Sequence, residues 1–279
     1  MLNAHGHAVR YIETTCVVDL DGRAANLQKS LARGLSWIER QPARTGKLAI
    51  VGSGPSVRDR LDKLKVWDGE IWAVNGAYDY LLSQGIVPDG FWGIDPLPGL
   101  AEYVKNARPE TTFYIAGSCD PSVFDVLEGY KVALWFPACD DLVYPEGALQ
   151  VPGGVTVLTR APFAAYDLGW RDITLFGADS SFDDKLEWRY CYDDGTYKED
   201  SRGELNFVQV EQGGPVFVSE ATLINQVTNL GIIKGVFGDV LKFDCDGLIA
   251  AHLSAPMNEI DKDGNVIGPC TEWFYENRR

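Results

Sequence analysis

The sequence predicts an α/β fold built on a doubly wound, mostly parallel sheet. Short apolar runs of strand length alternate with segments of helical periodicity along most of the chain. These runs are almost continuously apolar, as expected for strands that are buried on both faces. The chain has 279 residues, 46% of them hydrophobic, so it is long enough to bury such a sheet.

The elements can be assigned in order. Leu27, Leu31, Leu35 and Ile38 recur at helical spacing, which predicts an N-terminal amphipathic helix over 23–40. Six strands are expected after it, at 47–52, 70–75, 91–96, 112–116, 131–136 and 172–177. Helices are expected between and after them, from the turn at 53–56 through 64, then over 77–83, 100–106, 155–168 and 219–230 with Ser219 as N-cap. This alternation is typical of a Rossmann-like domain.

We expect three parts: an N-terminal extension and helix over 1–46, a Rossmann-like nucleotide-binding domain over 47–238, and a C-terminal β extension over 239–279. Residues 180–215 interrupt the alternation with paired aspartates and scattered aromatics, which predicts a long insertion. Residues 240–252 and 259–267 are strand-like. Residues 261–272 resemble a calcium-binding loop, but Asp263-Gly264 favours a hairpin turn between 259–260 and 266–267.

The charge balance excludes a general nucleic-acid binder. Twenty-five basic residues against forty acidic ones give a net charge of −15, whereas such a binder needs a cationic surface. No apolar run reaches the length of a membrane span, and we expect no signal peptide. The six cysteines are scattered without zinc-site spacing. We therefore expect a cytoplasmic protein that acts on small molecules.

A glycine-rich loop follows the first predicted strand. Its sequence is Gly52-Ser53-Gly54-Pro55-Ser56, in which two glycines let the backbone approach a ligand and Ser56 can cap a helix or touch a phosphate. A plain strand-to-helix turn explains the same residues equally well. The loop matches neither of the common phosphate-binding motifs.

Polar residues also follow three other strands. Asn75 fits either a contact with a base or ribose or a helix cap. Asp95 fits either a contact with a cation or hydroxyl or an Asp-Pro turn. Asp179, which follows Gly177, is again a candidate ligand for a metal or a hydroxyl, or a structural residue. Because the carboxyl ends of parallel strands share one edge of the sheet, these residues together predict a polar ligand there.

An ordered series of short motifs resembles the MptE-like 6-hydroxymethylpterin diphosphokinase family. The motifs lie at 48–56, 73–77, 85–89, 93–96, 153–154 and 168–179, and the resemblance covers about 23–235. It implies that ATP donates pyrophosphate to a hydroxymethyl group on a pterin-like acceptor, with Mg²⁺ present. It also implies catalytic and metal-binding roles for Asp95 and Asp179. The nucleotide would contact Gly52, Ser53, Gly54, Pro55, Ser56, Asn75, Gly153, Gly154 and Gly177.

Two other functions stay open. The loop and the Asn-terminated strand are also similar to bacterial sialyltransferases that use a CMP-linked sugar, but residues 213–220 lack the histidine base of those enzymes. A glycosyltransferase with an acidic base is thus the first alternative, and a non-catalytic binding protein is the second. The expected partners are a nucleotide and a small acceptor, with a homo-oligomer left open.

The acidity of the chain suggests how phosphate would be held. Few lysines or arginines stand near the motifs, so we expect the phosphates of a nucleotide to be held by backbone N–H groups and a divalent cation. On this hypothesis, Asp179→Asn abolishes activity and leaves folding intact.

Overall fold

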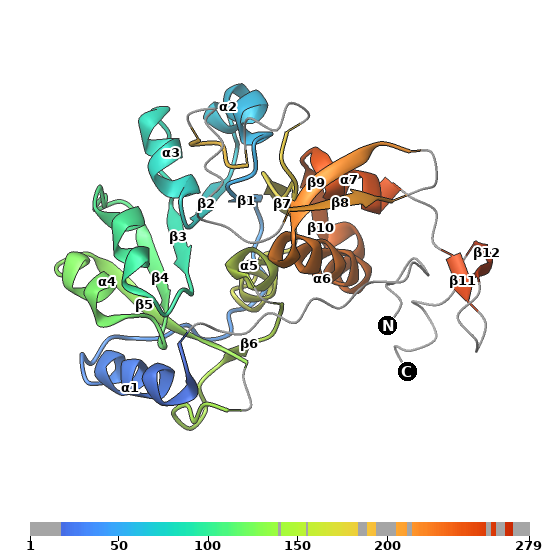
Figure 1. Cartoon of the computed structure of the whole chain (residues 1–279). Coiled ribbons are helices and arrows are strands. Elements are labelled where there is room, and N and C mark those ends of the chain that lie inside the picture. The colour runs from blue at the N-terminus through green and yellow to red at the C-terminus, as the bar shows by residue number, and fades with distance from the viewer. Residues whose placement is uncertain are drawn as a thin grey trace.

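The computed structural model has the predicted α/β fold, with an eight-stranded sheet that is parallel throughout (Figure 1). It describes residues 18–138, 141–154, 156–183, 189–193, 205–210, 214–254, 258–260 and 266–269. The strand order is β10-β7-β1-β2-β3-β4-β5-β6. These strands are β1 (Leu48–Val51), β2 (Glu70–Val74), β3 (Gly90–Gly93), β4 (Thr112–Ala116), β5 (Lys131–Pro137), β6 (Gln150–Val151), β7 (Ile173–Phe176) and β10 (Leu241–Asp244).

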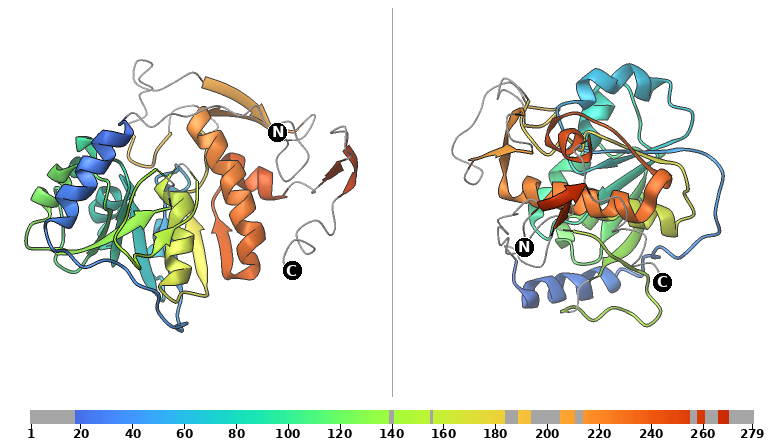
Figure 2. Two further views of the ribbon diagram at one scale, coloured as in Figure 1. Left: turned by 90° about the horizontal axis from the view of Figure 1, so that it is seen from below. Right: turned by 90° about the vertical axis from the view of Figure 1, so that its right-hand side faces the viewer.

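Helices flank this sheet and follow most of its strands (Figure 1). In the described ranges they are α1 (Leu20–Leu31), α2 (Val57–Lys65), α3 (Ala77–Ser83), the 3₁₀ helix η1 (Pro98–Val104), α4 (Pro121–Val126), α5 (Val157–Asp167), α6 (Ala221–Phe237), the 3₁₀ helix η2 (Gly238–Val240) and α7 (Gly247–Ser254). Helices α5 and α6 lie side by side (Figure 2). Within the described chain, no helix has the length and apolar character needed to cross a bilayer.

The strand order reverses next to β1. Strands β1 to β6 follow one another in a single direction, whereas β7 and β10 lie on the other side of β1. The connections after β1 and β7 therefore leave the sheet toward opposite directions, which opens a crevice at the carboxyl ends of these two strands. This is the position at which open α/β sheets bind their ligands.

The sheet holds the core. Leu48, Ile50 and the other residues of β1 are completely buried, because helices or loops cover both faces of this strand. Farther along the sheet, Trp92 stacks on Tyr114 with ring centroids 4.5 Å apart, and Trp72 packs against both. The apolar runs therefore form the strands they predict, and the rigid sheet fixes the loops at its edge.

The N-terminal helix is shorter than predicted. Helix α1 ends at Leu31, and Gly34 follows with a left-handed φ of 67°. Beyond it, the N–H of Ile38 donates to the carbonyl of Leu134, and the N–H of Leu134 donates to the carbonyl of Ser36. Pairing with β5 thus replaces the predicted last turns, and Ile38 is buried in an extended segment. Helical periodicity alone did not reveal this tertiary pairing.

The C-terminal region also differs from its prediction. Residues 240–252 were expected to be strand-like, but β10 ends at Asp244 and α7 begins at Gly247, which has a φ of 69°. Strand β10 pairs with β7, so the predicted C-terminal extension contributes an edge strand to the main sheet. The short strands β11 (Asn258–Ile260) and β12 (Val266–Pro269) pair antiparallel, as the hairpin prediction requires. Their connecting turn lies outside the described residues.

The predicted insertion over 180–215 contributes a strand and a short loop segment to the described structure. Strand β8 (Leu205–Gln209) pairs antiparallel with β9 (Val216–Glu220), which leads directly into α6. Ser219 therefore lies in β9, and Glu220 takes the N-cap position that was expected for Ser219. The hydroxyl of Ser219 instead donates to the carbonyl of Ser180, at 2.7 Å.

Candidate functional site

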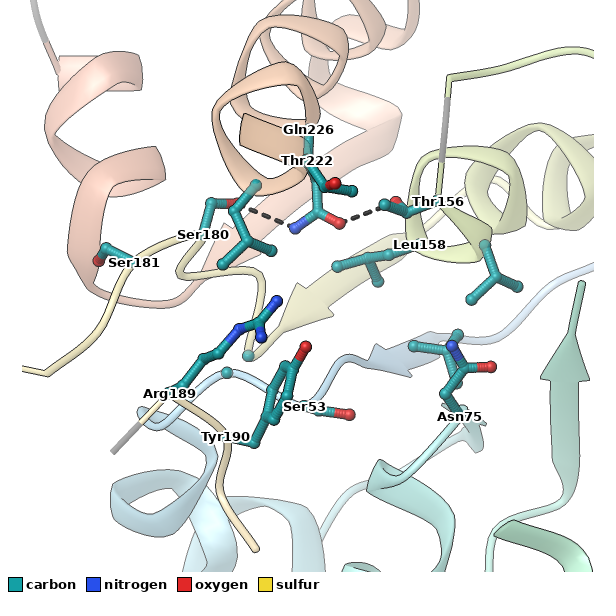
Figure 3. A pocket seen from close by; sticks show the side chains of 15 residues that line it. Ser53, Asn75, Thr156, Leu158, Ser180, Ser181, Arg189, Tyr190, Thr222 and Gln226 are labelled. Atoms are coloured by element: carbon teal, nitrogen blue, oxygen red, sulfur yellow. Dashed lines mark hydrogen bonds between the residues drawn. The ribbon is translucent and has the colours of Figure 1, made fainter. Parts of the chain in front are cut away.

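A pocket of about 150 Å³ lies at the crevice beside β1 and β7 (Figure 3). Its walls come from the loops after β1, β2 and β7, from the first turns of α5 and α6, and from residues 189–193, which we call the strap. The lining residues are Ser53, Gly54, Val74, Asn75, Thr156, Val157, Leu158, Gly177, Ser180, Ser181, Arg189, Tyr190, Thr222, Leu223 and Gln226.

Asp179 fastens the loop after β1 to the loop after β7. Its Oδ2 accepts from the N–H of Ser56 at 2.7 Å, and its Oδ1 accepts from the Ser56 hydroxyl at 2.6 Å and from the N–H of Asp246 at 3.1 Å. Burial raises the pKa of this carboxyl, while the bonds from Ser56 and Asp246 oppose that rise. Both oxygens face protein donors, so Asp179 shapes the pocket from behind its wall.

The glycines of the first loop are required by this same packing. A Cβ on Gly52 would lie 2.6 Å from the carbonyl oxygen of Gly177, and a Cβ on Gly54 would lie 2.6 Å from Oδ2 of Asp179. The N–H of Gly54 also donates to the carbonyl of Gly177 at 2.8 Å. The two loops therefore approach each other too closely for a side chain at either position, which is a sufficient reason for both glycines. The sequence did not predict this contact between the loops.

Two residues with left-handed backbone face the pocket. Among the described residues other than glycine, Asn75 (φ 46°) and Ser180 (φ 58°) are the two with positive φ. Both line the cavity. Such conformations cost free energy and tend to occur where a site requires them, so their location supports a functional role for this pocket.

Asn75 presents an unsatisfied acceptor. Helix α3 has Gly76 at its N-cap position and no side-chain cap among the described residues, so Asn75 does not have the capping role that was its alternative. Its Oδ1 is buried and has no hydrogen-bond partner in the described structure. A buried amide oxygen normally has a donor, so the protein does not fix this amide, and a small rotation of the side chain would present it to a ligand hydroxyl or N–H in the cavity.

A hydrogen-bonded chain crosses the far wall (Figure 3). The Thr156 hydroxyl donates to Oε1 of Gln226 at 2.7 Å, and Nε2 of Gln226 donates to the Ser180 hydroxyl at 2.9 Å. The Ser180 hydroxyl in turn donates to the carbonyl of Ala178 at 2.7 Å. The chain ties the start of α5 to α6 and to the loop after β7, which fixes the relative positions of these three walls.

The strap is anchored at several points to the loop and helix that follow β1. The N–H of Cys191 donates to the carbonyl of Ser53 at 2.8 Å, and Arg58 donates to the carbonyls of Cys191 and Asp193. Burial raises the pKa of the Cys191 thiol to about 12, so this thiol is a neutral packing group at neutral pH. The strap therefore holds the side chains of Arg189 and Tyr190 against the pocket.

Arg189 places a cation at the pocket. Its side chain is only 10% exposed and points into the cavity, on the opposite side from Asn75 (Figure 3). One guanidinium nitrogen pairs with Glu220 at 2.6 Å, while its Nε has no hydrogen-bond partner among the residues described. We expected few basic residues near the motifs, and the insertion brings one, Arg189, to the pocket.

The predicted site residues fall into two groups. Ser53, Gly54, Asn75 and Gly177 line the pocket, whereas the other candidates do not. Gly52, Pro55, Ser56 and Asp179 belong to the fastened loops behind the wall, and Gly153 and Gly154 precede α5. Asp95 is exposed, and its carboxylate accepts from the N–H of Leu97 at 2.9 Å, which is the turn role that was its alternative. The catalytic role expected for Asp95 is thus a proposal without support from this geometry.

The residues present do not fit a protein-built Mg²⁺ site. Asp179 has donors on both oxygens, and Asp95 does not line the pocket. Within the described ranges, no three His, Cys, Asp or Glu side chains are grouped so as to hold a metal ion. Mg²⁺ commonly binds through substrate phosphates and few protein ligands, so the lack of a carboxylate cluster among the described residues does not bear on Mg²⁺ that arrives with a nucleotide.

Sequence reasoning missed most of the far wall. Thr156 is the N-cap of α5, and Thr222 and Gln226 lie in the first two turns of α6. Both helices were predicted, and helix starts at this edge are a signal that could have indicated these residues. Tyr190 is one of the scattered aromatics of the insertion. Arg189 was not singled out, because its proximity to the β1 loop depends on how the insertion folds back.

Asn75→Gly is expected to separate stability from ligand binding. Glycine adopts a φ of 46° without strain and removes a buried oxygen that lacks a donor. The free energy of unfolding should therefore stay the same or rise by about 1 kcal/mol. Nucleotide affinity should fall at least tenfold. Thermal melts with and without nucleotide test this, and unchanged affinity would contradict a ligand role for Asn75.

The fold is similar to that of a solved glycosyltransferase structure. The MAf glycosyltransferase from Magnetospirillum magneticum AMB-1 has a similar structure, with a TM-score of 0.64 and 22% identity. The match covers 84% of this chain, which spans only 38% of the glycosyltransferase. A thiamin pyrophosphokinase from Geobacillus thermodenitrificans also matches, at 20% identity and a TM-score of 0.25, over 47% of this chain and 46% of that one. No curated protein matches the chain.

The family comparison covers most of the sheet and the first half of the pocket. The model for 6-hydroxymethylpterin diphosphokinase MptE-like proteins matches residues 24–185, which is more than half of the chain. The matched range contains β1, β7 and the two loops that Asp179 joins. The chain therefore belongs to the 6-hydroxymethylpterin diphosphokinase MptE-like family.

Proposed function

We propose that this protein is a nucleotide-dependent transferase that moves pyrophosphate from ATP to a hydroxymethyl-bearing, pterin-like acceptor. Membership of the MptE-like family supports ATP as the donor. The observation that carries the proposal is the pocket at the reversal of strand order. It combines a cationic side chain at one end with an unsatisfied amide oxygen at the other.

The pocket suggests how the nucleotide binds. Its phosphates would lie near Arg189 and the starts of α5 and α6, where a guanidinium and backbone N–H groups favour negative charge. The nucleoside would extend toward Asn75, whose Oδ1 would accept from a ribose hydroxyl or a base N–H. Tyr190 also lines the pocket, but its ring stacks on Tyr192 and lies beside the Arg189 guanidinium, so it would contact the base or the sugar through its edge.

The reaction asks mainly for positioning and charge neutralisation. The acceptor's hydroxyl oxygen attacks the β-phosphorus of ATP, and the bond from that phosphorus to the α–β bridging oxygen breaks. AMP leaves with the electron pair, and the hydroxyl proton passes to solvent. In this scheme the chain holds the reacting groups in line, and Asp179 acts by holding the Ser53–Gly54 wall in place.

Glycosyl transfer from a nucleotide sugar is the second candidate. It is favoured by the structural similarity to the MAf glycosyltransferase, which extends over 84% of the chain and so beyond the range of the family model. Such an enzyme would use the same pocket for the nucleoside diphosphate or nucleoside monophosphate part of its sugar donor. It would release no AMP from ATP.

A binding panel followed by product analysis distinguishes the two candidates. The full chain would be melted with ATP, CMP, UDP and a CMP-linked and a UDP-linked sugar, each with and without Mg²⁺. Reaction with ATP and 6-hydroxymethyl-7,8-dihydropterin would then be followed by ³¹P NMR. We expect an ATP-dependent rise in Tm and formation of AMP. A rise with a nucleotide sugar alone would favour glycosyl transfer, and no rise with any compound would overturn both.

We also propose a cytoplasmic location and small-molecule substrates. In the described ranges, Cys119, Cys191 and Cys245 carry free thiols, which is usual in a reducing compartment.

A further inference from the structure

The strap and the starts of α5 and α6 meet at one part of the pocket wall. We propose that Arg189, with the first turns of α5 and α6, is a subsite for a phosphate or pyrophosphate group, and that Glu220 tunes its affinity. The inference deepens the proposed function and rests on it for the identity of the whole substrate. The observations that carry it are separate from the sequence motifs.

The first observation concerns the two helices. Residues Thr156 to Leu158 of α5 and Thr222 to Leu223 of α6 all line the cavity, so both first turns face the same space. Neither helix has a side-chain cap on these turns in the described structure. Uncapped N–H groups of two helices thus converge on one pocket with the positive ends of both helix dipoles.

The second observation is the state of Arg189. Its side chain is nine-tenths buried and lines the cavity, and among the residues described its charged partner is the carboxylate of Glu220. A guanidinium has five N–H donors, so a buried one that is paired with one carboxylate keeps donors that a phosphate oxygen in the cavity would satisfy. The neighbouring Val157, Leu158 and Leu223 lower the local dielectric constant, which strengthens such a contact.

Glu220 explains how this charge is tolerated without ligand. It occupies the N-cap position of α6, but its carboxylate pairs with Arg189 at 2.6 Å and makes no capping bond to that helix. Both side chains are 10% exposed. The pair is neutral overall, and the carboxylate contacts Nη2 of the guanidinium. Its negative charge opposes the binding of a second anion.

The ligand chemistry follows from the number of donors. One guanidinium and two sets of backbone N–H groups approach from different walls, which suits a tetrahedral oxyanion with several acceptor oxygens better than a planar monocarboxylate. The phosphate can come from ATP or from a nucleotide sugar. Both share the group that this subsite recognises.

Titration of the full chain with inorganic pyrophosphate, by calorimetry and thermal melts, tests the subsite without a nucleotide. Arg189→Gln should weaken pyrophosphate binding at least tenfold. Glu220→Gln should tighten it several-fold, because glutamine keeps an acceptor for Arg189 but removes the opposing charge. Acetate should not bind, and Lys105→Gln, which removes an exposed cation at the C-cap of η1 and outside the pocket, should behave as the wild type.

The opposite signs separate this role from a structural one. If the ion pair served folding alone, both changes would weaken binding in proportion to lost stability, or neither would change it. The double variant Arg189→Gln/Glu220→Gln keeps a neutral buried pair and should fold without binding pyrophosphate. Nucleotide binding that ignores Arg189 would overturn the subsite and leave the proposed function standing. Pyrophosphate binding that needs Arg189, with no nucleotide bound, would overturn the function and leave the subsite.

Discussion

Replacing Asp179 with alanine is expected to lower the free energy of unfolding by about 3 kcal/mol or more. The change removes the carboxylate that accepts hydrogen bonds from three donors: the N–H and the hydroxyl of Ser56 and the N–H of Asp246. The cost of burying the carboxylate offsets part of this loss, since burial raises its pKa. Urea denaturation gives the measurement, and wild-type stability in the variant would contradict the fastening role.

Asp179→Asn is the matched variant. Asparagine keeps one acceptor oxygen but turns an amide N–H toward one of the donors, so an intermediate loss is expected. The earlier expectation of intact folding is therefore revised. Because the folded pKa lies above the unfolded one, the native state binds the extra proton, and wild-type stability falls as pH rises through that window. The difference in the free energy of unfolding between the wild type and Asp179→Asn should therefore become smaller as the pH rises.

Gly54→Ala is expected to lower the free energy of unfolding by about 2 kcal/mol or more and to weaken nucleotide binding. Its Cβ would lie 2.6 Å from Oδ2 of Asp179 and 2.7 Å from the carbonyl oxygen of Gly177. Neither atom can retreat easily, because both belong to the joined loops. The displaced segment carries Ser53, which lines the pocket and whose carbonyl accepts from the strap.

Gly99→Ala provides the control for this effect. Gly99 lies in η1 with open space around its Cβ position and no positive φ, so alanine should change stability by less than about 0.5 kcal/mol. Chemical denaturation and nucleotide titration of both variants are the measurements. Equal behaviour of the two alanine variants would show that close approach between the loops does not matter.

Local sequence signals were reliable where local physics decides the outcome. The run at 48–51 is apolar and lies between polar segments, so it forms a central strand wherever the chain can cover both of its faces. The loops after β1 and β7 were located correctly for the same reason. Strand β6 and helix α4 were not predicted, because two and six residues carry too little periodicity to stand out.

The roles of the loop residues required the folded structure. Asp179 and Ser56 are 123 positions apart, and no spacing rule indicates that one carboxylate accepts both the N–H and the hydroxyl of that serine. The sequence also could not decide between the two roles considered for Asp95, because an Asp-Pro pair is compatible with a turn and with a ligand contact. Only its exposure and its bond to Leu97 distinguish them.

The order of apolar runs and polar loops therefore determined the α/β class and the edge of the sheet at which the pocket lies, and the short motifs indicated the family. Tertiary structure decided which residues line the pocket. Arg189 reaches the pocket because the strap is bonded to Ser53 and Arg58, across more than 130 residues of chain. Periodicity records local burial, whereas the charge of a pocket depends on contacts between distant segments, and these form only when the whole chain folds.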